Sequence, residues 1–247
     1  MISQIFHSVF YQPLYNGLVF LISVIPGADV GLAVIILTLL VKIIILPLSH
    51  RSVASQAKMR SIEPEIKKVK EQHKDKQEQA RQVMDLYKKH GVNPLSGCFL
   101  MLIQLPVIFA LYWVFLKGLA HNIDQTLLYS FVAAPEHINT HFLGLVDMSK
   151  KNIVLAALAG ISQYFQMKFS MPPIPNNNGE KKKGDLSFKD EFTKNMNLQM
   201  RYMLPGIVFF VAYSISSAVA LYWLVSNLFS IGHELIVKRK ALRLIKT

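Results

Sequence analysis

The feature that most constrains this chain is an apolar run from Gly31 to Leu48, which contains a single charged residue, Lys42. A helix needs about 20 predominantly apolar residues to cross a bilayer, so this run is a candidate transmembrane helix. A second run, Leu95 to Phe115, is uncharged throughout. Since 52% of the 247 residues are also hydrophobic, we predict an integral membrane protein rather than a soluble domain.

Further spans are predicted in the second half of the chain. Tyr202 to Val237 holds one charged residue, Glu234. As one helix rising about 1.5 Å per residue, it would far exceed a hydrocarbon core of about 30 Å. It must therefore fold back once, and the serine-rich segment 214–217 marks the turn. Asn152 to Met167 supplies another short span, which brings the total to five.

The distribution of Lys and Arg predicts the orientation. Residues 49–90 hold 11 of the 27 Lys and Arg, residues 168–201 hold 7, and the tail from Lys238 holds 5. Because short cytoplasmic loops carry an excess of Lys and Arg, these three segments are predicted to be cytoplasmic and the segment from Lys117 to Lys151 external. With five spans, the N-terminus lies outside and the C-terminus inside.

The N-terminal segment admits two interpretations. Leu14 to Pro26 is apolar, but its 13 residues are typical of interfacial segments, and we expect an external interfacial helix. The alternative is that Ile2 to Ile25 forms a sixth span, which would place the N-terminus in the cytoplasm and leave the other assignments unchanged. Met1 to Ala28 contains no Lys or Arg, so we expect no cleavable signal peptide and a chain that is complete as written.

The cytoplasmic segment from Ser49 to His90 is predicted to form a helical hairpin, because both halves have apolar residues at helical spacing. His73 to Lys76 is the predicted tip, and Pro64 is expected to kink the first arm or break its hydrogen bonding. The hairpin either links two spans or serves as a mobile platform for substrate or ribosome. Residues 171–190 have the composition of a flexible loop.

The predicted fold is therefore an all-α integral membrane protein with five transmembrane helices in a bundle and a cytoplasmic helical hairpin. In chain order, the predicted segments are an external interfacial helix (1–28), span 1 (29–48), the hairpin (49–90), span 2 (93–117), an external segment (118–151), span 3 (152–169), a flexible cytoplasmic loop (170–200), span 4 (201–215), span 5 (216–237) and a basic cytoplasmic tail (238–247).

Lys42 is the main candidate functional residue, because a Lys at the centre of a span costs about 2.5 to 3.5 kcal/mol on insertion scales. Thr38 lies one turn earlier on the same helical face. One alternative is that Lys42 snorkels to the cytoplasmic interface. However, residues 43–47 are all apolar, so its amine would have to extend past more than one turn. A water-filled cavity would accommodate the charge at lower cost.

Polar residues in the other spans are candidates to line this cavity with Lys42. Each alone is more typical of a hydrogen bond between packed helices, but several recur one turn apart and form polar stripes. The candidates are Gln104 in the second span, Ser162, Gln163 and Gln166 in the third, and Tyr222, Ser226 and Asn227 in the last. Together with Lys42 they indicate a hydrophilic groove.

Motifs of enzyme chemistry are not found in the sequence. We find no phosphate-binding glycine loop, no metal-ligand cluster and no nucleophile motif. His137 and His141 have i, i+4 spacing, but they lie in the external segment without a convincing acidic partner, so no metal site is expected there. We expect neither an enzyme nor a bound cofactor.

Four stretches of the chain stand out in order: VKIIILPL (41–48), QAKMRSIEPEI (56–66), LYKKHGVNPLSGCFLMLIQLPVIFALYW (86–113) and ALYWLVSNLFSI (220–231). These stretches resemble the YidC/Oxa/Alb family of membrane protein insertases. The similarity runs from about residue 13 to residue 240, and the NPLSGC, QLP and LYWLVSN blocks are its most specific parts. The chain looks like a minimal bacterial member, without the large external domain of some relatives.

The resemblance implies a groove among the five spans that is open to the cytoplasm and to lipid but closed on the outside. Lys42 stands where the family usually has Arg, and Gln163 stands at the family's polar site in the third span. Tyr222 and Trp223 fall on the face of the last span that meets the substrate helix. An ammonium lacks the planar fork with which Arg binds carboxylates, so the strength of the interaction at Lys42 is in question.

The function implied by the resemblance is that of an insertase and chaperone in the bacterial inner or plasma membrane. It would receive hydrophobic segments of nascent membrane proteins in the groove, translocate short polar tails and release the segments into lipid without nucleotide hydrolysis. Two rival functions are a solute transporter, which predicts repeats or broken helices in two matching halves that we do not find, and an assembly factor that binds spans without translocating anything.

The basic hairpin and the tail from Lys238 suit docking to the ribosome, because Lys and Arg bind rRNA phosphates with an affinity that is independent of sequence and falls as salt rises. The alternatives are topology-setting charge and binding of anionic membrane lipids. The protein acts either alone or beside the Sec translocon.

Overall fold

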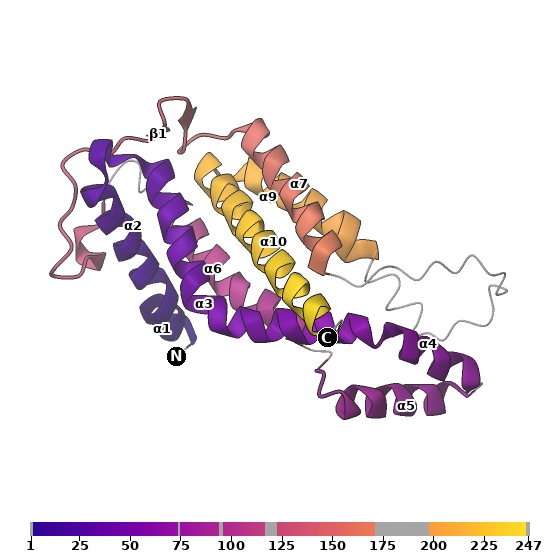
Figure 1. Cartoon of the computed structure of the whole chain (residues 1–247). Coiled ribbons are helices and arrows are strands. Elements are labelled where there is room, and N and C mark those ends of the chain that lie inside the picture. The colour runs from indigo at the N-terminus through magenta and orange to yellow at the C-terminus, as the bar shows by residue number, and fades with distance from the viewer. Residues whose placement is uncertain (1, 74, 94–95, 117–122, 171–197, 246–247) are drawn as a thin grey trace.

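The computed structural model describes residues 2–73, 75–93, 96–116, 123–170 and 198–245. It is mostly helical, and its long helices lie side by side in a bundle from one end of which a helical hairpin projects (Figure 1). We call this the hairpin end, and we call the opposite end, which carries the segment predicted to be external, the external end. The predicted flexible loop at 171–190 lies outside the described residues, as do Lys74 in the predicted hairpin tip and residues 117–122.

Helices make up nearly all of the regular structure in these ranges. An N-terminal run consists of α1 (Ile2–Phe6), the π-helical η1 (His7–Tyr11), α2 (Gln12–Val24) and the 3-10 turn η2 (Pro26–Ala28). The bundle and hairpin are then built from α3 (Val30–Ser61), α4 (Glu63–Gln72), α5 (Lys76–Lys89), α6 (Ser96–Leu116), α7 (Ile153–Ser170), the π-helical η4 (Gln199–Met203), α9 (Leu204–Ser214) and α10 (Ser217–Ile245).

The N-terminal run packs lengthwise along the bundle. Its stretch Gln4–Val24 is long and apolar enough to cross a membrane, as are Val30–Met59 and Ser217–Val237. Tyr11, Leu18 and other residues of the run are buried against α3 and α6, and α1 lies toward the hairpin end (Figure 1). Because an interfacial helix would lie across the helix ends instead, this arrangement favours the alternative of a sixth span.

Helix α3 continues without interruption from its apolar part into the hairpin. It includes Pro47, which removes one intrahelical hydrogen bond, and it ends at Ser61, beyond the predicted end of the first span at residue 48. Pro64 lies in the first turn of α4, where proline is favoured because its missing N–H would have no intrahelical partner. The first arm is thus interrupted at Ile62, two residues before Pro64, which agrees with the expectation that Pro64 kinks this arm or breaks its hydrogen bonding.

Helices α9 and α10 are joined by a short turn. Helix α9 ends at Ser214 and α10 begins at Ser217, so the chain reverses within the serine-rich segment. Helix α7 packs against both helices. A Cβ atom at Gly160 would lie 3.1 Å from the Phe209 Cβ and 3.2 Å from the Pro205 carbonyl oxygen, so the small residue lets α7 approach α9 closely.

The segment predicted to be external contains the 3-10 turn η3 (Gln125–Leu127) and a short antiparallel pair, β1 (His141–Phe142) with β2 (Val146–Asp147). This pair departs from the all-α expectation. It forms because Leu143 and Gly144 adopt positive φ and reverse the chain within a tight turn. The fold is thus mostly helical rather than all-α.

Two groups of buried apolar residues form the core, and α10 contributes to both. The larger group joins the N-terminal run, α3, α6 and α10, with Leu18, Val34 and Ala110 among its members. The smaller group joins α7, α9 and α10 through small residues such as Ala159 and Ala220. Helix α10 therefore separates two seams, one toward α3 and α6 and one toward α7.

Candidate functional site

The Lys42 side chain lies where α3, α6 and α10 meet. Its ammonium Nζ donates hydrogen bonds to Gln104 Oε1 and to Ser230 Oγ, both at 3.2 Å. The Gln104 amide Nε2 in turn donates to the Tyr222 hydroxyl. The two direct partners are a neutral amide and a hydroxyl, so they hydrogen-bond the ammonium without neutralising its charge.

The external side of this site is apolar. Thr38, one turn nearer to the external end, is 1% exposed and donates to the Val34 carbonyl oxygen at 2.6 Å. Its hydroxyl is thus satisfied within its own helix. Val34 and Ala110 are buried in the larger apolar group, so an apolar barrier separates the Lys42 ammonium from the external end of the bundle.

A second set of candidate residues lies on the seam between α7 and α10. Asn227 Nδ2 donates to Ser162 Oγ at 3.0 Å, and Ser162 Oγ donates to the Ala159 carbonyl oxygen at 2.8 Å. Gln163 Nε2 donates to Gln166 Oε1 at 3.1 Å. These are hydrogen bonds between and along packed helices. They fit a packing role for these residues rather than the lining of a groove.

The sequence prediction missed a buried carboxylate that continues this second set. Glu234 is 3% exposed, and its Oε2 accepts a hydrogen bond from Ser170 Oγ at 2.6 Å. Ser170 also accepts from Gln166 Nε2 at 3.5 Å. The sequence does mark Glu234, because it is the one charged residue in its apolar run. The same property identified Lys42 as a candidate. Ser230 was also missed, although it follows Ser226 by four positions and continues the polar stripe of Tyr222 and Ser226 on α10.

The ten residues predicted to line the groove do not come together in a single site. Tyr222 and Ser226 are four positions apart and share a face of α10, whereas Asn227 follows Tyr222 by five positions and lies roughly 140° around the helix. Trp223 packs beside the smaller apolar group. The structure therefore brings Lys42, Gln104 and Tyr222 together on one seam, and Ser162 and Asn227 together on the other.

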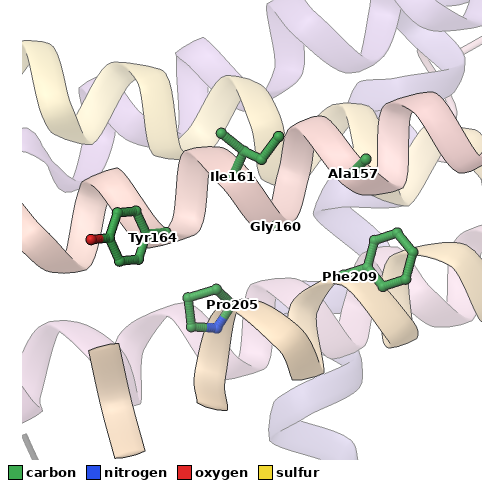
Figure 2. A pocket seen from close by; sticks show the side chains of 6 residues that line it. All are labelled: Ala157, Gly160, Ile161, Tyr164, Pro205 and Phe209. Carbon is green, nitrogen blue, oxygen red and sulfur yellow. The ribbon is translucent and has the colours of Figure 1, made fainter. Parts of the chain in front are cut away.

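A cavity of about 370 Å³ lies between α7 and α9 (Figure 2). None of the ten candidate residues lines it, and it holds no charged side chain. Its lining residues are Ala157, Gly160, Ile161, Tyr164, Pro205 and Phe209. An apolar depression of this kind beside a close helix contact fits a lipid-facing surface rather than a polar site.

Among the described residues, no three His, Cys, Asp or Glu side chains come together in a group that could hold a metal ion. His137 and His141 lie in the external segment, where His141 is the first residue of β1.

Residues 21–243 match the family described as 60Kd inner membrane protein. The membrane protein insertases YidC of Francisella tularensis subsp. novicida (strain U112) and of Francisella tularensis subsp. tularensis (strain SCHU S4 / Schu 4) are each 37% identical over 210 residues, which are 85% of this chain and 32% of the relative. The chain thus spans about a third of the length of these curated relatives.

A solved structure has a similar fold. It is described as an active YidC insertase crystal structure with the first transmembrane domain resolved, and it matches with a TM-score of 0.57 at 22% identity over 92% of this chain and 45% of that chain. The family match covers nearly the whole chain, and within the described residues three helices are long and apolar enough to cross a membrane. The chain therefore belongs to the 60Kd inner membrane protein family, the family of the YidC insertases, as a multi-pass protein of the bacterial inner membrane.

Proposed function

We propose that this protein is a membrane protein insertase. It receives the hydrophobic segment of a nascent membrane protein beside α3 and α10, lets the short polar tail of that segment cross past Lys42, and releases the segment into lipid without nucleotide hydrolysis. The observation that carries the proposal is a half-buried Lys42 with neutral hydrogen-bond partners on the hairpin side of an apolar barrier.

The charge of Lys42 supplies the attraction for an acidic or polar tail. Two opposite charges about 4 Å apart attract by about 4 kcal/mol at an effective dielectric constant of about 20. A carboxylate that reaches the ammonium displaces only the neutral groups of Gln104 or Ser230, so no existing ion pair has to be broken at these contacts. The tail is thereby held part of the way across the membrane.

Hydrogen bonds at the external end support access from the hairpin end alone. The Asp29 carboxylate accepts from the Gly31 N–H at 2.7 Å and from the Leu143 N–H at 2.9 Å, which joins the β1–β2 turn to the start of α3. The Ser217 hydroxyl donates to the Lys150 carbonyl oxygen at 2.6 Å at the start of α10. The external segment thus covers the helices that hold the Lys42 site.

Apolar side chains beside Lys42 support lateral release. Ile43 follows Lys42 about 100° around α3, and Leu105 follows Gln104 about 100° around α6; their side chains are 55% and 38% exposed. In a membrane these side chains contact lipid tails. A hydrophobic segment that enters beside Lys42 therefore has lipid next to it and gains free energy by partitioning there.

The topology proposed with this function has six spans rather than five, with both termini in the cytoplasm. The N-terminal run begins toward the hairpin end (Figure 1), and the basic hairpin marks that end as cytoplasmic. The hairpin and the tail from Lys238 then face the ribosome, whose rRNA phosphates they contact. The protein acts as an insertase and chaperone either alone or beside the Sec translocon.

The test is reconstitution of the purified protein in liposomes with a single-span substrate that carries an acidic external tail. Protection of the tail from added protease reports translocation. We expect Lys42→Ala to lower protection by about tenfold or more, since it removes an attraction of several kcal/mol, and Lys42→Arg to retain it because the charge is kept. Lys151→Ala, at an exposed external lysine, is the matched control and should behave as wild type.

Two outcomes would contradict the proposal. If the wild-type protein left the tail unprotected while still binding the substrate, the protein would be an assembly factor rather than an insertase. If Lys42→Ala protected the tail as well as wild type did, the attraction at Lys42 would not be the driving step.

A further inference from the structure

Two histidines that the proposed function does not use face each other across the seam between α3 and α10. His50 Nδ1 lies 3.3 Å from His233 Nε2, and the ring centroids are 5.5 Å apart. His50 follows Lys42 by eight positions and His233 follows Ser230 by three. The histidine pair therefore lies on the same seam as Lys42, nearer to the hairpin end.

The separation of the two ring nitrogens matches the spacing that a metal ion requires. An imidazole nitrogen binds zinc at about 2.0 to 2.1 Å, so two such nitrogens on one tetrahedral ion lie roughly 3.4 Å apart. The observed 3.3 Å is within that spacing. When each ring carries its proton on the far nitrogen, both lone pairs face the gap, and a small rotation of each ring directs them at one ion.

The helices hold this spacing in place. Both histidines stand on long helices that pack closely along their length, so the two ligands are positioned before an ion arrives. His50 is exposed, which leaves room for water in the remaining coordination positions. Lys42 on the same seam disfavours a cation, whereas the Glu234 carboxylate next along α10 favours one.

We propose that His50 and His233 form a two-histidine site for a late first-row divalent metal ion, such as Cu²⁺ or Zn²⁺, and that the bound ion holds α3 to α10 at the hairpin end. Imidazole nitrogen suits these ions and not Mg²⁺ or Ca²⁺, which take oxygen ligands. The affinity follows the general order for divalent ions, so Cu²⁺ binds more tightly than Zn²⁺.

The functional consequence rests on the proposed insertase function. A substrate tail that displaces Ser230 from Lys42 breaks a hydrogen bond between α3 and α10, and an ion that bridges His50 and His233 opposes the separation of these two helices at the hairpin end. Zinc should therefore inhibit insertion, and a chelator should restore it.

The binding test uses the full chain in lipid nanodiscs, purified through a tag without histidine and titrated with Cu²⁺ or Zn²⁺ alone. We expect one ion per chain. His50→Gln and His233→Gln should each weaken binding at least about tenfold, which corresponds to about 1.4 kcal/mol. His137→Gln, at an external histidine, is the control and should leave the affinity unchanged. Equal affinity of the wild type and the His50→Gln/His233→Gln double variant would overturn the site.

A second measurement tests the link between the helices without any insertion assay. Zinc should slow amide hydrogen exchange at the hairpin end of α3 and α10 in the wild type and not in His233→Gln. If zinc bound to the wild type but left exchange unchanged, the ion would not join the helices, and that part of the proposal would be wrong.

The liposome assay then separates the two proposals. Saturating zinc should lower protection of the substrate tail at least about fivefold in the wild type, a change of about 1 kcal/mol, and leave His233→Gln unaffected. If zinc bound to the protein without lowering insertion, the proposal that the bound ion inhibits insertion would be refuted. Failure of insertion in metal-free protein would instead refute the insertase function, and the metal site would still be judged by titration and exchange.

Discussion

Asp29 joins three backbone groups at the external end, and its replacement by Ala gives a quantitative prediction of stability. The residue is 6% exposed. Its Oδ1 accepts from the N–H groups of Gly31 at 2.7 Å and Leu32 at 3.1 Å, which caps the first turn of α3. Its Oδ2 accepts from the Leu143 N–H at 2.9 Å, which holds the β1–β2 turn against α3.

The expected loss for Asp29→Ala is the sum of these two roles. Removing an Asp cap costs about 0.5 to 2 kcal/mol. Losing the bond to Leu143 costs about 0.5 to 1.5 kcal/mol, because water reaches this partly buried turn and replaces part of the bond. We therefore expect a decrease of about 1 to 3.5 kcal/mol in the free energy of unfolding. Asp29→Asn keeps the cap but turns an amide toward the Leu143 N–H, so it should lose only the second part.

The assay is unfolding in mixed micelles with a rising fraction of dodecyl sulfate, followed by tryptophan fluorescence from Trp113 and Trp223. Asp75→Ala is the matched control, because Asp75 caps α5 in the hairpin by accepting from the Gln77 N–H at 3.1 Å and lies outside the bundle. The reasoning would be refuted if Asp29→Ala unfolded at the same midpoint as Asp75→Ala, or if Asp29→Asn were as unstable as Asp29→Ala.

Two further predictions concern the second seam and the external segment. Asn227→Ala removes the donor to Ser162 Oγ and should cost about 0.6 to 1.7 kcal/mol, as measured for bonds between membrane helices. If this bond only packs the helices, the Asn227→Ala variant should insert substrate as well as the wild type does, and adding Ser162→Ala should lower the free energy of unfolding little further. Loss of insertion at unchanged stability would instead place Asn227 in the substrate path. Burial raises the pKa of Asp147, but the Ser149 N–H and the Lys150 ammonium lower it by more, so this pKa lies below its ordinary value of 3.8. A carboxyl with a lowered folded pKa stabilises the fold above its unfolded pKa and loses that contribution as pH falls through the folded pKa. Asp147→Asn should therefore be less stable than wild type at neutral pH, and the difference should shrink as pH falls below 3.8; a difference of constant size would contradict this.

Features that depend on a single stretch of chain could be predicted from the sequence. The apolar runs around Lys42 and in α10, the reversal between Ser214 and Ser217 and the two arms of the hairpin follow from local composition. An apolar run has to leave water, and a polar segment has to reach it, whatever surrounds them. The free-energy cost of placing a charge in such a run also identifies Lys42 as a candidate functional residue from the sequence alone.

Features that depend on how helices rotate and shift against one another were decided only by the tertiary structure. Ser230, 188 positions after Lys42, is its partner because α10 packs on α3 in one register. The same packing turns Asn227 toward α7, away from Tyr222, and brings His50 to His233. Periodicity shows which residues share a face of one helix, but the neighbour that this face meets is set by the packing of side chains from all of the helices together.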